Sequence, residues 1–458
     1  MDRIKQFYKN NKPLIIYMLV VFFMHILMHE NEILDAKRYF ATVLDQYDMR
    51  TFLSLRYHTW SSRIVIEACL AMFSRNLLIW GILDFLVFVL LYLSLKKLLA
   101  LKADEPVAWI LVGCIFMYYM GDMSSAGWVA TLMNYMWPLS FGLFAAIPLM
   151  NGIRKEKTHP VIWVLSFPAL IYAANMEQMA ALLFAFYSIA LIYIISLFVR
   201  KTRGWEKTNR TMFFLGIVQW VLTLAELLFI LTCPGNAVRA EEEILKSEGN
   251  LGFGMNTMLD KFLSGLDHCM TTFLNSNLLL LEFALVVSIL LFIRYKRTTE
   301  TFCGIILIAF SLIVPLSNSL ESVGKLMTDS SMRPGIHNFT RISGYAVPAI
   351  WMLFMMVMGI CLVMLCTSRI EAIFLLLLLA GGFVSKIIIG FSPSLISSAS
   401  RTQIYLQFAV VFLIVYLIKK YEAELTEKPA LKNALYIFTA LISVIGVMNS
   451  MVRIINFV

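Results

Sequence analysis

Charged residues are scarce in this chain, and their scarcity excludes a water-soluble protein. Asp, Glu, Lys and Arg make up 15% of the 458 residues, whereas 60% are hydrophobic and the mean hydropathy is +0.78. A soluble domain carries about 25% charged and about 45–50% apolar residues. Successive apolar runs of about 20 residues, the length that a membrane-spanning helix needs, fill the sequence. The composition therefore predicts an all-α polytopic membrane protein.

Several signatures of catalysis are also missing. The sequence contains no Walker loop, no Rossmann fingerprint, no HExxH zinc motif and no G-x-S-x-G turn. ATP-driven transport and serine or zinc hydrolysis therefore have no support. The seven cysteines form no close pairs with metal-ligand spacing, so neither a zinc site nor a disulfide framework is indicated. We expect no metal and no cofactor.

The net charge of +9 indicates membrane topology and not a nucleic-acid partner. The basic residues are split among short loops. With the N-terminus in the cytoplasm, the inside loops carry more Lys and Arg than the outside segments, although the outside segments are longer. Residues 14–28 lack an A-x-A-like cleavage site, so this run is expected to stay as the first span.

Thirteen apolar runs predict thirteen spans in a single membrane-embedded unit, residues 1–458. The spans are expected near 13–29, 77–98, 106–121, 137–150, 160–174, 178–199, 211–231, 276–294, 301–317, 345–366, 370–390, 402–419 and 432–450. Three outside segments are long: 30–76, 232–275 and 318–343. We expect amphipathic helices on the membrane surface in the first two. Any chemistry is therefore expected at the outer face.

Three acids open the first outside segment. Asp35 lies just beyond the apolar run that ends near Met28, at or below headgroup depth. A carboxylate partly removed from water has a raised pKa and can act as general base toward a hydroxyl. Asp35 is therefore the first candidate for a catalytic base, with Glu30 and Glu32 as alternatives. The competing interpretation is a helix N-terminus, where the helix dipole favours acids.

Four outside arginines are candidates for an anion site. Arg63 ends the motif W-S-S-R beside Trp60, Arg239 ends CPGNAVR, Arg341 lies in HNFTRISGY and Arg401 in FSPSLISSASRT. Guanidinium groups pair bidentately with phosphate oxygens. Each arginine alone is explained as a snorkelling anchor, but the set of four predicts a phosphate site. Trp60 is also a candidate for contact with a sugar.

Two polar segments add candidates for sugar or acceptor binding. Residues 121–139, GDMSSAGWVATLMNYMWPL, contain Asp122, Asn134, Tyr135 and Trp137 and no basic residue. Such a segment lies at membrane depth only if it is buried in protein or lines a cavity. A tight connection between spans is the competing interpretation.

The second polar segment is AANMEQMAAL, which places Asn175 and Glu177 between two short apolar runs. Intramembrane acids are functional hypotheses by default because they are unfavourable in hydrocarbon. The alternative is a hydrogen-bonded structural acid.

The order of these motifs carries a resemblance to a known family. The motifs are an acid after the first span, W-S-S-R, G-W-x-x-T-x-x-N-Y-x-W-P-L, N-M-E-Q, C-P-G-N-x-x-R and S-P-S-x-x-x-S-x-x-R-T. Over most of its length the chain resembles a family of bacterial multispan proteins that is similar to the GT-C glycosyltransferases, including GtrII-like enzymes. The resemblance implies a GT-C-like fold in the bacterial cytoplasmic membrane. It also implies transfer of a sugar from a polyprenyl-phosphate donor to a glycan or lipid acceptor at the outer face.

The resemblance places the catalytic acid at Asp35, with Glu32 as the second candidate. Paired acids are expected at this place in the family, but Leu34 precedes Asp35 and the nearest acid is Glu32. A metal-dependent mechanism is therefore not supported, and Asp35 is expected to act alone as base.

Two other functions stay open. A flippase or transporter of lipid-linked sugars would explain Glu177 and the intramembrane Lys386, although no inverted repeat is evident. A polysaccharide polymerase or ligase also uses outside arginines and lipid-linked substrates. It normally has one dominant outside loop, whereas three are comparable here.

Overall fold

The structure, a computed structural model, describes most of the chain. The described residues are 11–102, 105–199, 207–245, 257–274, 277–295, 298–317, 345–395 and 400–457, with Phe253 and Ser398. Within them all secondary structure is helical apart from an isolated bridge between Ser125 and Gly127. Eight helices among the described residues are long and apolar enough to cross a membrane, or nine if one bent pair forms a single span. The prediction of an all-α, multi-pass membrane protein is confirmed.

The chain divides into two compact units. Unit 1 contains Met1–Lys102, Met123–Glu241 and Ile454–Val458, and unit 2 contains Ala103–Asp122 and Glu242–Arg453. The sequence predicts one membrane-embedded unit. The two compact units are described one after the other below.

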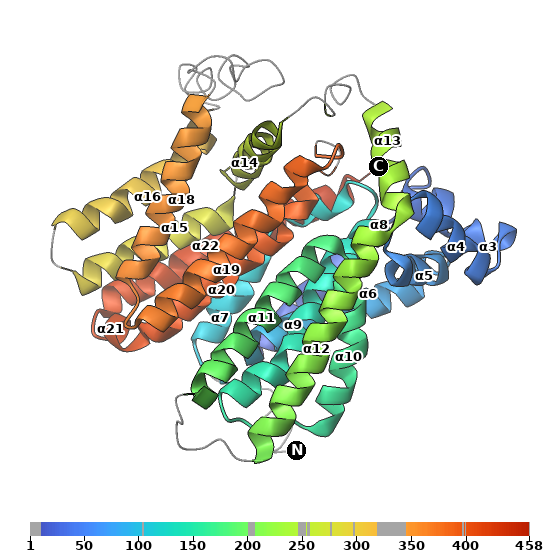
Figure 1. The fold of residues 1–458 in the computed structure, drawn as a ribbon. Helices are drawn as coiled ribbons and strands as arrows, with labels where there is room; N and C mark the ends of the chain where they lie inside the picture. Colours follow the sequence, from blue (N-terminus) through green and yellow to red (C-terminus); the bar gives the residue numbers. More distant parts are fainter. Residues whose placement is uncertain are drawn as a thin grey trace, which may run out of the picture. The chain divides into compact units, whose positions relative to one another are not determined.

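Unit 1 is built from the N-terminal helices and a group of long helices that follow. Its helices are α2 (Lys12–Leu27), η1 (Ala36–Phe40), α3 (Val43–Gln46), α4 (Met49–Thr59), α5 (Ile64–Phe73), α6 (Leu77–Leu98), α8 (Trp128–Thr131), η3 (Leu132–Met136), α9 (Trp137–Ile153), α10 (Pro160–Ala174), α11 (Glu177–Val199), α12 (Lys207–Thr232) and α13 (Pro234–Leu245). Helices α9 to α12 run side by side, and α6 packs on α9 and α2 (Figure 1). The polar candidates of unit 1 lie near the ends of these helices.

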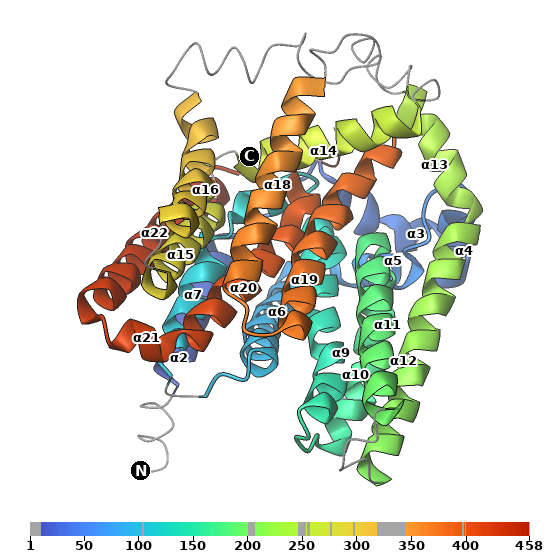
Figure 2. The same cartoon turned by 60° about the vertical axis from the view of Figure 1, so that its left-hand side comes forward.

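Unit 2 contains α7 and the helices of the C-terminal half. Its helices are α7 (Val107–Met117), η2 (Met120–Ser124, across the chain boundary with unit 1), α14 (Met258–Leu274), α15 (Leu278–Arg294), α16 (Thr298–Ser317), α18 (Ala346–Met364), α19 (Arg369–Ile387), η7 (Ile388–Phe391), η8 (Ser400–Gln403), α20 (Ile404–Lys420), α21 (Glu422–Thr426) and α22 (Pro429–Ile455). The most enclosed is α20, which packs on α7, α15 and α19 (Figure 2). Its span is 83% buried inside the protein, so side chains on it meet other helices and not lipid.

Every predicted span overlaps an apolar helix, but the number of spans stays a prediction. Among the described residues, four helices in these positions are shorter apolar segments of 10–17 residues: Lys12–Leu27, Val107–Met117, Pro160–Ala174 and Thr299–Leu312. The segment 30–76, which was predicted to lie outside, holds η1 and α3 to α5, and the described part of 232–275 holds α13 and α14. The predicted segment 318–343 lies outside the described residues.

The helix at the predicted span 137–150 begins earlier than that span. Trp128–Ile153 forms one apolar helix, and its most apolar part is 67% buried. The chain turns at Gly127, whose φ of +89° favours glycine, and a side chain there would collide with Glu30 Oε1. The π-helical turn η3 lies within this helix. The sequence places residues 121–139 at membrane depth only if protein buries them. Residues 128–139 are largely buried and so meet this condition.

Candidate functional site

The centre of the candidate site is an ion pair between Arg63 and Glu177 in unit 1. Arg63 Nε donates to both Glu177 oxygens, at 3.0 and 2.9 Å, and the Nη2–Oε2 distance is 2.8 Å. The side chains are only 15% and 29% exposed, so water screens the pair weakly. Glu177 begins α11 and Arg63 precedes α5, so two helix N-termini meet here.

The third nitrogen of the Arg63 fork binds the polar segment at 121–139. Arg63 Nη1 donates to Asn134 Oδ1 at 3.0 Å, and Asn134 Nδ2 in turn donates to the Ala130 carbonyl at 2.8 Å. These bonds assign the amide orientation, because the oxygen must face the guanidinium. Tyr135, the next residue, lies within electrostatic reach of Arg63. Two of the predicted sugar contacts therefore adjoin the predicted phosphate ligand.

Asn175 fixes the backbone that carries Arg63. It lies in the break between α10 and α11, and its Oδ1 accepts the Val65 and Ile66 amides at 2.9 and 3.2 Å. Its Nδ2 donates to the Ser62 carbonyl at 3.3 Å. The side chain is 1% exposed, so Asn175 caps α5 from a distant part of the chain and supports Arg63. Its prediction as a sugar contact is not supported by this geometry.

The motif C-P-G-N-x-x-R places Arg239 against Trp60. Cys233 Sγ contacts the Tyr57 carbonyl at 3.1 Å, and a Cβ on Gly235 would lie 2.5 Å from the Trp60 amide nitrogen. Only glycine allows the start of α13 to approach the end of α4 this closely. The Arg239 guanidinium then lies 6.0 Å from the Trp60 ring centre and acts electrostatically on Glu177.

A second arginine covers the Trp60 ring and is neutralised locally. Arg56 lies 5.3 Å from the ring centre, and it forms a forked pair with Glu67, at 2.5 Å from Nε and 2.9 Å from Nη2. Glu67 is 5% exposed. This pair was not predicted. Its signal in the sequence is an acid within the apolar run IVIEACLAMF.

Of the three acids that open the predicted outside segment 30–76, the buried one is Glu30. Its Oε2 accepts the Val129 amide at 3.0 Å, so Glu30 caps α8 from a distant part of the chain, and Oε1 is buried with no hydrogen-bond partner among the described residues. Burial raises the pKa of Glu30 to about 7, against the lowering effect of the Val129 and Trp128 amides. Val129 precedes Asn134 by five residues on one helix, about 7.5 Å along its axis.

The two predicted catalytic acids, Asp35 and Glu32, are both exposed. Asp35 precedes η1 and forms no cap hydrogen bond, and Glu32 pairs with Lys37 at 3.3 Å with its own side chain 80% exposed. Helix α2 ends at Leu27, and Asp35 is exposed, so it does not lie in a pocket of the protein. Its expected position at headgroup depth stays a prediction. The catalytic role of Asp35 itself stays a prediction.

Trp137 belongs to a different network in unit 1. Its Nε1 donates to Asp84 Oδ1 at 2.5 Å, and His25 Nε2 bonds Asp84 Oδ2 at 2.8 Å. Asp84 is fully buried and Trp137 is 4% exposed, so the indole is unable to stack on a sugar in this arrangement. Asp84 escaped prediction, although it is the one acid in the 22-residue helix α6.

Two predicted residues, Asp122 and Arg401, belong to a polar cluster in unit 2. Asp122 Oδ1 accepts the Ser400 hydroxyl at 2.6 Å, and Lys386 Nζ donates to Thr402 Oγ1 at 2.7 Å. Burial raises the pKa of Asp122 to about 6, opposed by Ser400, Lys386 and Gln407. Arg401 lies near enough to Lys386 to act on it electrostatically.

The predicted set therefore separates into groups. Unit 1 brings together seven predicted residues: Trp60, Arg63, Asn134, Tyr135, Asn175, Glu177 and Arg239. Arg341 lies outside the described residues. Among the described residues no three His, Cys, Asp or Glu side chains are grouped to hold a metal.

Comparisons with protein-family models, curated proteins and solved structures give no match. The GT-C resemblance therefore rests on the sequence motifs alone.

Proposed function

We propose that the chain is a membrane glycosyltransferase, with its site at the Arg63 cluster of unit 1. In this proposal it moves a sugar from a polyprenyl-phosphate donor to a glycan or lipid acceptor. The observation that supports it most is the Arg63 fork, held by Glu177 and Asn134 beside Arg239 and Trp60. These groups come from four of the motifs that carry the family resemblance.

Charge at the cluster suits a phosphate leaving group. Arg63 forms an ion pair with Glu177, and the Arg239 guanidinium acts electrostatically on the same carboxylate. As the bond between the anomeric carbon and the phosphate oxygen breaks, the electron pair leaves with the phosphate. Fixed cations stabilise that developing charge. Glu177 holds Arg63 in place beforehand, so little reorganisation is needed in the reaction.

The acceptor hydroxyl needs a base that takes its proton as it attacks the anomeric carbon. Asp35 is the residue that the resemblance assigns, and Glu30 competes with it. Glu30 is buried, its pKa of about 7 is near neutral pH, and Oε1 has no partner. A base with a pKa near the working pH is the more efficient one. We therefore favour Glu30 as base.

The number of spans, the GT-C-like arrangement and the orientation in the membrane are part of the same proposal. It comprises a GT-C-like arrangement with about thirteen spans, in a bacterial cytoplasmic membrane, with a cytoplasmic N-terminus and an extracytoplasmic active face. It is supported by an apolar helix at every predicted span and by the excess of Lys and Arg in the inside loops.

A transfer assay tests the proposal. Purified protein in liposomes receives a radiolabelled polyprenyl-phosphate sugar and a cell-envelope glycan acceptor. We expect label on the acceptor, a loss of at least about 100-fold in rate for Glu30→Gln through loss of the base, and an unchanged rate for the control Glu241→Gln. Full activity in Glu30→Gln together with inactivity of Asp35→Asn would return the base to Asp35. If neither the natural chain nor any variant transfers label to the acceptor, the glycosyltransferase proposal is refuted.

A carrier for lipid-linked sugars is the second candidate, and one observation favours it. Lys386 is fully buried within a membrane helix of unit 2, where its ammonium group reaches a hydroxyl and the Asp122 carboxylate is close enough to act on it. Buried ionisable groups in spans are typical of transport pathways. In the liposome assay a carrier moves label across the bilayer without transferring it to the acceptor.

A further inference from the structure

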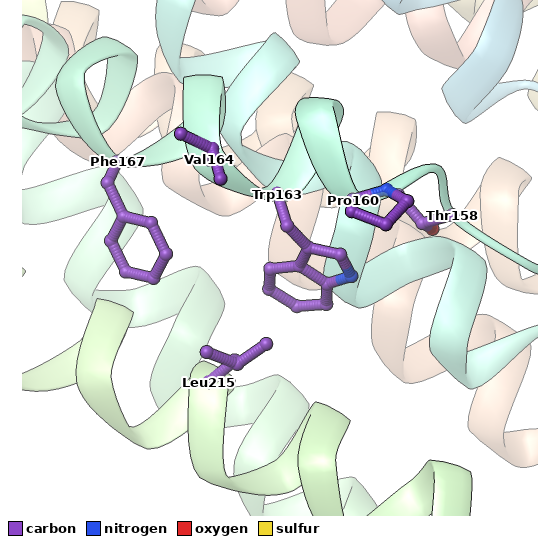
Figure 3. A pocket seen from close by; sticks show the side chains of 6 residues that line it. All are labelled: Thr158, Pro160, Trp163, Val164, Phe167 and Leu215. Carbon is purple, nitrogen blue, oxygen red and sulfur yellow. The ribbon is translucent and has the colours of Figure 1, made fainter.

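An apolar pocket lies between α10 and α12 of unit 1, away from the Arg63 cluster. It is lined by Thr158, Pro160, Trp163, Val164, Phe167 and Leu215 and has a volume of about 580 Å³. Figure 3 shows Trp163 and Phe167 projecting from α10, with Leu215 of α12 facing them. The volume is within the range of about 300–1,000 Å³ that small-molecule pockets occupy. A wall with one hydroxyl and five apolar side chains fits a hydrocarbon chain.

Residues 154–157, here called the rim, lead along the chain to the lining residue Thr158 and carry three basic side chains. The connection RKEKTH, residues 154–159, leads directly to Pro160 at the start of α10. Arg154 Nη1 donates to the Lys97 carbonyl at 3.0 Å, and Glu156 pairs with Lys97 at 2.6 Å. Lys155 and Lys157 are exposed and form no ion pair with any described residue. The rim therefore offers two ammonium groups to an anion.

The rim is held in one conformation by hydrogen bonds. The buried Asn151 donates to Thr158 Oγ1 at 3.0 Å, and the His159 ring accepts the Val161 amide at 3.3 Å as the cap of α10. Lys155 occupies the left-handed region, with φ of +61°, as α9 ends. This conformation is unfavourable for lysine and persists only where the surroundings determine it.

We propose that this pocket and its rim form a binding site for an anionic glycerophospholipid. One acyl chain lies in the pocket against Trp163 and Phe167, and the phosphate lies at Lys155 and Lys157. Basic pockets between membrane helices recognise anionic headgroups in this way. The assignment is independent of the glycosyltransferase proposal, because it uses no residue of the Arg63 cluster.

The charge of the rim decides between lipid classes. A zwitterionic lipid fills the pocket equally well with its acyl chain, but its choline group opposes the two lysines. An anionic headgroup pairs with both. Phosphatidylglycerol and phosphatidylcholine with identical acyl chains therefore separate the contribution of the rim from that of the pocket.

Lipid binding to the full chain in detergent, measured by native mass spectrometry, tests the site. We expect phosphatidylglycerol to bind more tightly than phosphatidylcholine. The double variant Lys155→Gln/Lys157→Gln should bind phosphatidylglycerol roughly 30-fold more weakly, the combined contribution of two lysines beside an anionic headgroup. Its binding of phosphatidylcholine should weaken much less, because the choline charge offsets that of the phosphate.

Two further variants keep the test decisive. Lys428→Gln/Lys432→Gln removes the same charge elsewhere and should preserve the preference for phosphatidylglycerol. Leu215→Trp fills the pocket and should weaken both lipids alike, with helix content by circular dichroism confirming the fold. Equal binding of both lipids by the natural chain, or unchanged binding in the rim or pocket variants, would overturn the proposal.

Discussion

The two units hold their buried cations in opposite ways. In unit 1 the Arg63 guanidinium is bound on every nitrogen, to both oxygens of Glu177 and to Asn134. In unit 2 the Lys386 ammonium donates to the neutral hydroxyl of Thr402, and Asp122 acts on it electrostatically. Planar forks of donors suit bidentate partners, whereas an ammonium group is a point charge. Unit 1 therefore presents a guanidinium fork bound to a carboxylate, and unit 2 an ammonium group bound to a hydroxyl.

Replacing Arg63 and Lys386 in turn tests the difference between the two units most strongly, because it should give the largest change in stability. Arg63→Met leaves the partly buried carboxylate of Glu177 without its ion-pair partner, which should lower the free energy of unfolding by about 3–5 kcal/mol. Lys386→Met should cost less, because Asp122 keeps its bond from Ser400. Denaturant unfolding in detergent measures both. Equal losses would show that the two sites do not differ.

The pH dependence of stability sharpens the comparison through the acids Glu30 and Asp122. Both have a raised pKa in the folded state, so the folded state binds the extra proton and stability falls as pH rises. For Glu30 the loss runs from pH 4.5 to about 7 and amounts to about 3 kcal/mol. For Asp122 it runs from pH 3.8 to about 6 and is slightly smaller.

Amide variants identify each contribution to the pH profile. Glu30→Gln should flatten the stability profile between pH 6 and 7, where Asp122→Asn should have little effect. Unfolding midpoints in detergent between pH 4 and 8 measure the slopes. A slope that survives in Glu30→Gln would show that another group titrates.

The dependence of the Arg63 site on its scaffold is testable at Asn175. Asn175→Ala removes the cap of α5 and leaves two buried amides without partners, so it should cost about 2 kcal/mol. The matched control is Asn76→Ala, which removes an exposed cap of α6 and should cost about 1 kcal/mol. Thermal unfolding compares the two, and equal costs would argue against a special role for Asn175.

An exposed ion pair should contribute least. Arg75 and Asp45 lie 2.6 Å apart, but their side chains are 41% and 66% exposed. Asp45→Asn should change the free energy of unfolding by less than about 1 kcal/mol, and less still at high salt. A larger loss would show that geometry alone, without burial, decides the stability of pairs in unit 1.

Much of the fold and part of the site follow from the sequence. Apolar length alone marks the helices, because hydrocarbon requires every backbone group to bond within its segment. The residue Glu177 was predictable as an acid between two apolar runs with almost no loop. Its partner Arg63 was predictable only as an anion ligand, because a contact across more than 100 residues leaves no local pattern.

The failures have physical causes as well. Asp35 and Glu30 are five residues apart, and no periodicity shows which of them turns inward. Gly127 decides it, because the space without a side chain receives the Glu30 carboxylate. Asn175 and Trp137 look like sugar contacts by residue type, but cap and core bonds use their polar atoms.

The Michaelis constant for the polyprenyl-phosphate donor in the Arg239→Gln variant tests the central proposal most directly. Loss of one charge-assisted hydrogen bond to phosphate should raise it roughly 10–100-fold, while Arg38→Gln, which removes an exposed cation of η1, should leave it unchanged. An unchanged constant in Arg239→Gln would contradict a phosphate site at the Arg63 cluster.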